Sequence, residues 1–280
     1  MALSSIQNNM LLYFQKQQAV LIEKYPLASE HLDSEAIHKI RLSIKKIKAF
    51  FNLILYLHPS CQIYKPRFKN LKVLFKSCGQ VRDLQIQNYL LKAYEEKMDI
   101  QFTEFSGYFQ SKQKKINKQF SKNQGIFQSE KLQNQEQKLV SLLMVLDDDY
   151  INRQASKKLR TNIKQIKKLS IKKKSAKNVH YIRKVLKESI YIMEINPWIK
   201  STENEVVLFA ALKNLSEELG LWHDREIMLQ HLNIFSKIHH KKISEIEDYI
   251  ILKGFLLLEN KDFIKTLDKK LNEVVSLTKK

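Results

Sequence analysis

The sequence predicts an all-α fold, and three observations lead to this prediction. Glycine and proline are scarce, with five and four among 280 residues, where an average globular sequence carries about 12% of the two together. Apolar residues, within a hydrophobic content of 44%, recur at the three- and four-residue spacing of amphipathic helices. A pattern of residues also recurs about 140 positions along the chain, which indicates two copies of one helical unit. Sandwiches, barrels and glycine-rich nucleotide folds are therefore disfavoured.

Each copy is expected to hold four principal helices, whose ends are marked by proline, glycine and capping residues. The expected helices of the first copy are residues 6–25, stopped by Pro26; a long helix from Ser34, a candidate N-cap, to His58-Pro59; residues 66–78; and a helix beginning just after Gly79. Those of the second copy are residues 153–170, 178–195 ended by Asn196-Pro197, 204–219, and a helix from about 222. Further helical stretches are expected near 100–120, 129–146 and 256–276.

The duplication is visible in two aligned pairs of segments. Residues 71–86 align with residues 212–227 at an offset of 141, and the segment His-Lys-Ile-Arg at 38–41 aligns with His-Tyr-Ile-Arg at 180–183 at an offset of 142. We expect one domain made of two repeats, residues 1–147 and residues 148–280.

The positive charge is concentrated in two stretches of the chain. The formal net charge is +20, and residues 151–187 contain fourteen Lys or Arg and no Asp or Glu. Residues 39–76 contain ten more and are also free of acids. Both stretches are periodic in apolar residues, which predicts that they are helices. Their lysines either form solvated faces or create a positive potential that attracts a polyanion.

The location predicted from the sequence is a reducing compartment, the cytoplasm. Only Cys61 and Cys78 are present, too few for a disulfide scaffold, and they do not form a Cys-x-x-Cys ligand pair. The first eighteen residues lack the pattern of a secretion signal, and no apolar run approaches the roughly 18 residues of a membrane span.

The helix that begins near Ser34 carries a basic row beside its apolar face. At 100° per residue, His38, Arg41, Lys45 and Lys48 fall within about 80° of arc. A solubilising face would lie opposite the apolar side, so this placement indicates a cleft or channel between helices. The row is about 15 Å long, which suits a chain of phosphates better than a single phosphate.

The second copy repeats part of this row. His180, Arg183 and Lys187 occupy the same arc, whereas Glu188 and Ile190 replace the other basic positions. The recurrence indicates that these side chains face a ligand. In the following helix of each copy, only the lysine pair Lys72 and Lys213 is common to both.

A third recurring segment places glycine four residues before aspartate. Gly79 precedes Asp83, and Gly220 precedes Asp224. We expect each glycine to permit a turn or left-handed C-cap, and each aspartate to orient a cation or cap the next helix. The residues just before the aspartates, Arg82 and His223, could point a second donor at the same ligand.

These segments together resemble the CHAD family, the conserved histidine α-helical domain. Its pattern is His-x-x-Arg followed by basic residues, and later Leu-Gly-x-x-Arg-Asp or Leu-Gly-x-x-His-Asp, in duplicated halves. The matching residues are His38, Arg41, Lys45, Lys46, Lys48, Gly79, Arg82 and Asp83 in the first half, and His180, Arg183, Lys187, Tyr191, Leu219, Gly220, His223 and Asp224 in the second. Cys78 stands where the family has Leu.

The resemblance implies two pseudo-symmetric four-helix bundles around a basic central channel that binds inorganic polyphosphate. It implies no catalytic activity for this domain, and we expect no catalytic residue, cofactor or metal. Association with polyphosphate granules in the cytoplasm is one location that would fit such a protein. The predicted contacts are His38, Arg41, Lys45, Lys48, Lys72, Arg82, His180, Arg183, Lys187 and Lys213, and the predicted orienting residues are Gly79, Asp83, Gly220 and Asp224.

Two other functions fit parts of the sequence. A nucleic-acid-binding helical protein would have the same basic helices, although its base contacts usually include aromatic or amide side chains. A metal-dependent phosphohydrolase would use the His223-Asp224 doublet, with His180 and Asp248 or Asp262 as further ligands. The eight-residue spacing of His223, His231 and His239 matches no known ligand pattern, and we interpret it as surface.

Overall fold

The computed structural model describes residues 3–60, 69–122, 125, 127, 129–172, 174–200, 202–238 and 247–278. Within these ranges the chain forms helices and no strand, as the sequence predicts. The elements are α1 (Ser5–His31), α2 (Ser34–Leu57), α3 (Lys69–Met98), α4 (Thr103–Ser121), α5 (Glu130–Leu143), α6 (Asp148–Ser170), α7 (Ala176–Ile195), the 3₁₀ helix η1 (Pro197–Lys200), α8 (Glu203–Ile238) and α9 (Glu247–Ser276).

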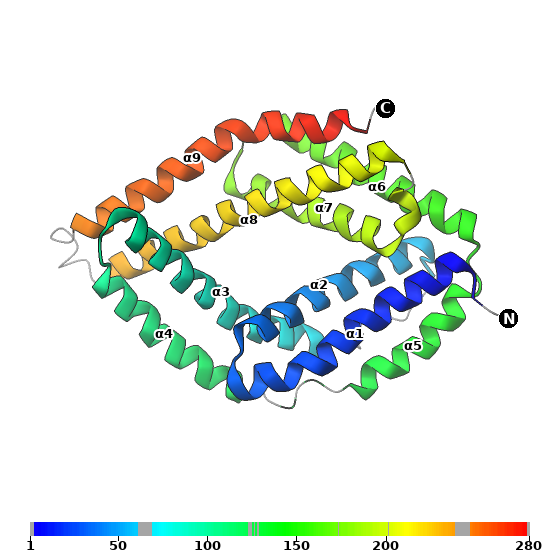
Figure 1. The fold of residues 1–280 in the computed structure, drawn as a ribbon, viewed down its shortest axis with the longest axis horizontal. Coiled ribbons are helices and arrows are strands. Elements are labelled where there is room, and N and C mark those ends of the chain that lie inside the picture. The colour runs from blue at the N-terminus through cyan, green and yellow to red at the C-terminus, as the bar shows by residue number, and fades with distance from the viewer. Residues whose placement is uncertain are drawn as a thin grey trace.

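The two halves of the chain use the same order of helix packing. In the first half α1 packs on α2, α2 on α3 and α3 on α4, and in the second half α6 packs on α7, α7 on α8 and α8 on α9. The halves meet where α2 lies against α7 and α3 crosses α8 (Figure 1). This arrangement is compatible with the duplication predicted from the sequence.

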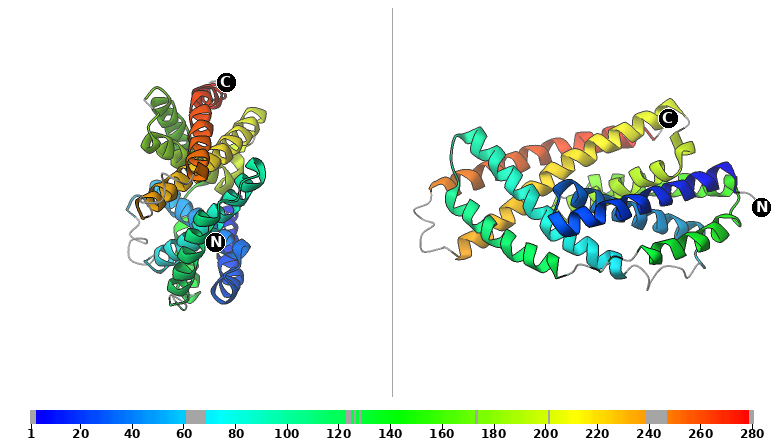
Figure 2. Two further views of the ribbon diagram at one scale, coloured as in Figure 1. Left: turned by 90° about the vertical axis from the view of Figure 1, so that its left-hand side faces the viewer. Right: turned by 60° about the horizontal axis from the view of Figure 1, so that its bottom comes forward.

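The halves differ in their outer helices. The single long helix α9 packs against both α8 and α6, whereas in the first half α4 packs on α3 and the separate helix α5 packs on α1. Figure 2 shows α4 and α5 following one another along one side of the molecule. In the first half, the two short helices α4 and α5 therefore cover the surface that is equivalent to the one covered by α9 in the second half.

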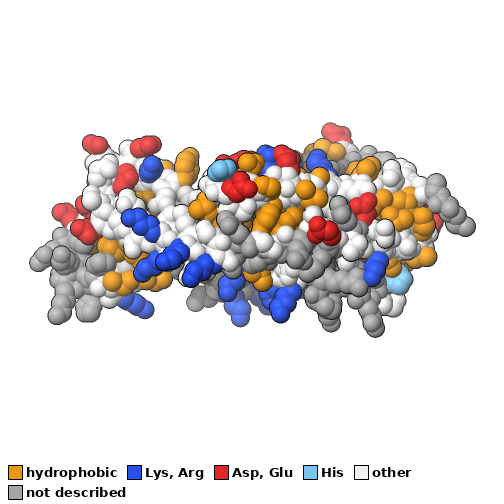
Figure 3. All heavy atoms as spheres, turned by 90° about the horizontal axis from the view of Figure 1, so that it is seen from below, with side chains coloured by type: hydrophobic (Ala, Val, Ile, Leu, Met, Phe, Trp, Pro, Cys, Tyr) orange, Lys and Arg blue, Asp and Glu red, His pale blue; other side chains and the backbone are white. Residues whose placement is uncertain are grey.

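The outer side of α4 is basic. Its exposed lysines are Lys114, Lys115, Lys118 and, at the C-cap, Lys122. Figure 3 shows Lys and Arg side chains in a row over the part of the lower face where α4 lies.

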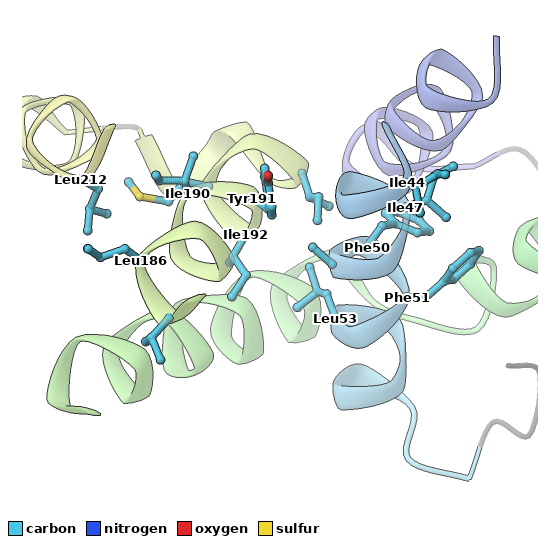
Figure 4. Packing of buried hydrophobic residues seen from close by; sticks show 14 of the residues in the cluster. Ile44, Ile47, Phe50, Phe51, Leu53, Leu186, Ile190, Tyr191, Ile192 and Leu212 are labelled. Atoms are coloured by element: carbon cyan, nitrogen blue, oxygen red, sulfur yellow. The ribbon is translucent and has the colours of Figure 1, made fainter. Parts of the chain in front are cut away.

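Two apolar cores hold the helices, and each core takes residues from both halves. The larger one joins α1, α2, α5, α6 and α7 to the first parts of α3 and α8 and to the end of α9. In its centre, Leu53 of α2 lies toward Ile192 of α7 (Figure 4). The smaller core joins the last parts of α3 and α8 to α4 and to the start of α9.

The predicted end of the first helix at Pro26 is wrong. Pro26 lies inside α1, which continues to His31 and ends where Leu32 adopts a left-handed conformation with φ 53°. Proline removes one backbone hydrogen bond, but Leu21 and Ala28 on either side of it are buried in the larger core. Their packing keeps the helix continuous.

The predicted breaks at Gly79 and Gly220 are also wrong. Both glycines lie inside continuous helices, α3 and α8, and among the described glycines only Gly125 has a positive φ. Asp83 and Asp224 are therefore mid-helix residues and cap nothing. The proposed start of α3 near residue 66 falls outside the described residues.

The predicted N-cap of α2 is displaced by one residue. Asp33 accepts the hydrogen bond from the Ala36 amide at 2.7 Å, and Ser34 is the first helical residue. The predicted ends of α2 at His58-Pro59 and of α7 at Asn196-Pro197 are confirmed. In the described part of the chain, no helix combines the length and the apolar character needed to cross a bilayer.

The aromatic cluster in the larger core makes a testable contribution to stability. Phe14 is fully buried, with its ring centroid 5.7 Å from that of Phe50 and 5.4 Å from that of Phe51. We expect Phe14→Ala to lower the free energy of unfolding by about 3–5 kcal/mol, because it removes this packing and leaves a cavity. Urea denaturation measures the change. As the control, Leu221→Ala at an exposed position should change it by less than about 0.5 kcal/mol; equal losses would contradict this core assignment.

Candidate functional site

The basic rows of α2 and α7 meet at the centre of the molecule. Lys45 and Lys187 each lie mostly enclosed by protein, and burial lowers the pKa of Lys45 to about 7 and that of Lys187 to about 8. After burial, the charge of Lys187 is the next cause acting on Lys45, followed by Arg41 and Arg183. The cations of the two halves are thus close enough to repel one another.

Arg41 is held in a fixed position by α3. Its Nη1 atom donates a hydrogen bond to the backbone carbonyl of Phe75 at 3.0 Å, and its guanidinium lies 4.6 Å from the centre of the Phe75 ring. The side chain is 16% exposed, and its Nη2 atom lies 3.8 Å from Oδ1 of Asp83. Arg41 is therefore positioned before any ligand arrives. Phe75 did not stand out in the sequence, because neither an apolar ring nor a backbone carbonyl belongs to a recognisable motif.

Gly79 provides the space in which Arg41 lies. A Cβ atom added at Gly79 would lie 2.2 Å from Nη1 of Arg41, whereas one added at Gly220 would have no neighbour within 4 Å. The glycine of the first half is thus explained by close approach of a side chain and not by a turn. The glycine of the second half has no such neighbour, so the two arginines are held differently.

Arg82 and Arg183 complete the set of guanidinium groups. Nη1 of Arg82 donates to the Ser34 hydroxyl at 2.9 Å, so Ser34 anchors this arginine instead of capping α2. The Nε atoms of Arg82 and Arg183 are buried and have no hydrogen-bond partner among the described residues. Buried donors without partners are costly, and a bound anion would supply the missing acceptors.

Two carboxylates lie among these cations. Burial raises the pKa of Asp224. The charge of Arg183 acts against this shift, and the charge of Asp83 adds to it. The Asp83 side chain is 57% exposed, yet the protein atoms around it raise its pKa, against the effect of Arg41, Lys45 and Arg82. The two carboxylates do not balance the five cations Arg41, Lys45, Arg82, Arg183 and Lys187, so the centre stays positive.

Three histidines border the cations. The rings of His180 and His223 lie with centroids 5.3 Å apart, and burial followed by the charge of Arg183 lowers the pKa of His223 to about 4. Burial also lowers the pKa of His38, whose neighbours include Arg82, Lys45 and Lys187. His223 is neutral at pH 7 and can donate one hydrogen bond without adding charge.

We call this group the central cluster: His38, Arg41, Lys45, Arg82, Asp83, His180, Arg183, Lys187, His223 and Asp224. It contains seven of the ten residues that the sequence predicts as ligand contacts. Lys48, Lys72 and Lys213 are exposed and are not among the charges that act on the pKa values of the cluster. Lys213 instead lies 4.5 Å from the centre of the Phe209 ring.

The two positions where the second copy departs from the basic pattern point away from the cluster. Glu188 pairs with Lys158 of α6 at 3.2 Å, and Ile190 is buried in the larger core. Neither is among the groups that shift the pKa values of Lys45, Arg183 or Lys187. The acid at position 188 therefore does not cancel the charge of the row.

The further ligands that the alternative metal site needs do not lie with His180, His223 and Asp224. Asp262 pairs with Lys265 at 2.8 Å, and Asp248 lines a separate pocket beside Phe235 and Tyr249. Within the described ranges, no three His, Cys, Asp or Glu side chains are grouped so that they could hold a metal ion. His231 contacts Tyr108 and Lys112, and His239 lies outside the described residues.

Because Arg41 lies against Gly79, alanine should affect the free energy of unfolding differently at Gly79 and at Gly220. Gly220→Ala should raise the free energy of unfolding by about 0.5–1 kcal/mol, the usual gain when alanine replaces glycine inside a helix. Gly79→Ala should gain less or lose stability, because Arg41 must leave its hydrogen bond to Phe75. Urea denaturation of the two variants measures both values, and equal gains would contradict the observed position of Arg41.

Comparisons with known proteins agree on one family. The CHAD domain family model matches residues 12–233. The crystal structure of the CHAD domain from the plant Ricinus communis is similar with a TM-score of 0.73 and 14% sequence identity, over 98% of this chain and 93% of that one. No curated protein sequence matches. The family match over most of the chain, the similar fold and the paired His-x-x-Arg helices show that this protein belongs to the CHAD domain family.

Proposed function

We propose that this protein binds inorganic polyphosphate at the central cluster, without catalytic turnover. The observation that carries the proposal is the convergence of five cations from α2, α3 and α7 around only two carboxylates. Such a group of like charges is unfavourable by itself, and a bound polyanion would relieve the repulsion. Arginine forks, lysine point charges and histidine donors are all suited to phosphate oxygens.

The surroundings of the cluster favour a phosphate chain over nucleic acid. Single-stranded nucleic acids bind where aromatic rings stack on their bases. Phe75 lies against the cluster, and Arg41 and Lys45 already lie over its ring, at 4.6 and 5.9 Å from its centre. A ligand made only of phosphates uses the cations and needs no stacking surface.

The same surroundings support binding rather than metal-dependent hydrolysis. A metal ion would have to lie at His223 and Asp224 beside Arg183 and Lys187, whose charges act directly on both residues. Cations in this position disfavour a second positive charge. We therefore propose that His223 donates to a phosphate oxygen.

The first test removes the two central arginines. We expect Arg41→Gln/Arg183→Gln to weaken polyphosphate binding at least tenfold, because charge-assisted bonds from both halves are lost. Isothermal titration calorimetry gives the affinity, and circular dichroism establishes that the helices remain. The control is Lys92→Gln/Lys118→Gln, which removes two exposed charges elsewhere and should leave binding nearly unchanged.

Two results would overturn the proposal. One is an unchanged affinity in the double-arginine variant. The other is displacement of polyphosphate by duplex DNA at an equal concentration of phosphate groups, which would favour nucleic acid as the ligand.

The low pKa values of the two lysines predict that binding takes up protons. Lys45, with a pKa of about 7, and Lys187, with a pKa of about 8, are mostly neutral at pH 8.5, and a bound polyanion raises both pKa values. Affinity should therefore fall as the pH rises from 7 to 9, and binding at pH 8.5 should take up about one to two protons. Calorimetry in buffers of different ionisation enthalpy measures this number.

Lys45→Arg is the matched variant for this measurement. Arginine stays charged throughout this pH range, so the uptake should fall by about one proton while binding persists. An uptake that is zero in the unaltered protein, or that does not change in the variant, would contradict the role of Lys45.

A further inference from the structure

The outer face of α6 carries a continuous row of exposed cations that the central cluster does not use. At 100° per residue these side chains fall within about 100° of arc and extend over roughly 22 Å of helix. We call this group the α6 row: Arg153, Lys157, Arg160, Lys164, Lys167 and Lys168.

The α6 row forms no ion pair within the described residues. Two inward-facing lysines of the same acid-free stretch do form one: Lys158 with Glu188 and Lys174 with Asp268. Cations four residues apart, such as Arg160 and Lys164, repel one another and destabilise the helix. A solubilising face usually intersperses both signs of charge, so this row is better suited to a polyanion outside the chain.

The α6 row is connected to the central cluster by the surface where α6 packs on α7. Gln165, which lies beside Lys164 and Lys168 on α6, donates a hydrogen bond to the Tyr181 hydroxyl of α7 at 2.6 Å. One turn beyond Tyr181 is the exposed Lys184, whose charge lowers the pKa of His180 in the cluster. Exposed cations therefore continue from His180 through Lys184 to α6.

We propose that the α6 row binds the part of a long polyphosphate chain that extends beyond the central cluster. This inference rests on the proposed function. A short chain would be held by the central cluster alone, whereas a long chain would leave it past Lys184 and continue along α6. Lysines with extended, mobile side chains suit such a track, because they neutralise phosphates without fixing the register of the chain.

The test compares two phosphate chains on two matched variants. The first variant is Lys157→Gln/Lys164→Gln/Lys167→Gln/Lys168→Gln in the α6 row. The second is Lys114→Gln/Lys115→Gln/Lys118→Gln/Lys122→Gln on α4, which lies on the other side of the molecule (Figure 1) and also carries a row of exposed lysines (Figure 3). Each variant removes four exposed lysines, and glutamine has nearly the same helix propensity as lysine.

Affinities for tripolyphosphate and for long-chain polyphosphate are measured over a range of salt concentrations. In the α6 variant, the slope of log affinity against log salt for the long chain should become shallower by about 3, since each phosphate contact contributes about 0.7 on a single-stranded polyanion. Its affinity for tripolyphosphate should be unchanged, and the α4 variant should keep the full slope.

The outcomes separate the two proposals. An unchanged slope in the α6 variant, or an equal change in the α4 variant, overturns the α6 track while leaving the central site intact. The proposed function itself fails if Arg41→Gln/Arg183→Gln binds each of the two ligands, tripolyphosphate and the long chain, as tightly as the unaltered protein does.

Discussion

The placement of several like charges at one point inside a helical protein is the constraint on which the rest of this structure depends. Cations that repel one another stay together only if other forces fix the backbone that carries them. Here the two apolar cores provide those forces, and the aspartates of the central cluster lie where α3 and α8 pass from one core to the other. The larger core includes Val81 and Trp222, and the smaller one begins at Leu84 and Met228. Asp83 and Asp224 occupy the gap between the two cores.

This position explains why α3 and α8 are long and continuous. Each helix contributes apolar residues to both cores and polar residues to the gap between them. A break at Gly79 or Gly220 would uncouple the cores and allow the charges to move apart. Local propensity favours a break at glycine, but burial on both sides outweighs a cost of about 1 kcal/mol per glycine. The sequence signals for helix ends were misleading at these positions because they report local preference only.

Much of the cluster could be predicted from periodicity and repetition. His38, Arg41 and Lys45 recur as His180, Arg183 and Lys187 at helical spacing, and residues on one face of a helix must share an environment. Lys48 shares the arc of this row but is exposed, because a helical angle does not define how far along the axis the neighbouring helix extends. The anchors of the arginines, the Phe75 carbonyl and the Ser34 hydroxyl, come from other helices. They could not be found without knowing which helices touch.

The two halves hold equivalent arginines in different ways, and this difference bears on how the site works. Arg41 is fixed by a hydrogen bond, an aromatic ring and the absence of a side chain at Gly79, so it loses little freedom when a ligand binds. Arg183 has the charge of Asp224 nearby and open space at Gly220. In the proposed function, the closely held Arg41 would fix one phosphate firmly, and Arg183, which lacks an equivalent contact with its glycine, would tolerate variation in the next. Such tolerance suits a repeating chain, because every phosphate along it presents the same oxygens and any of them can occupy the rigid half.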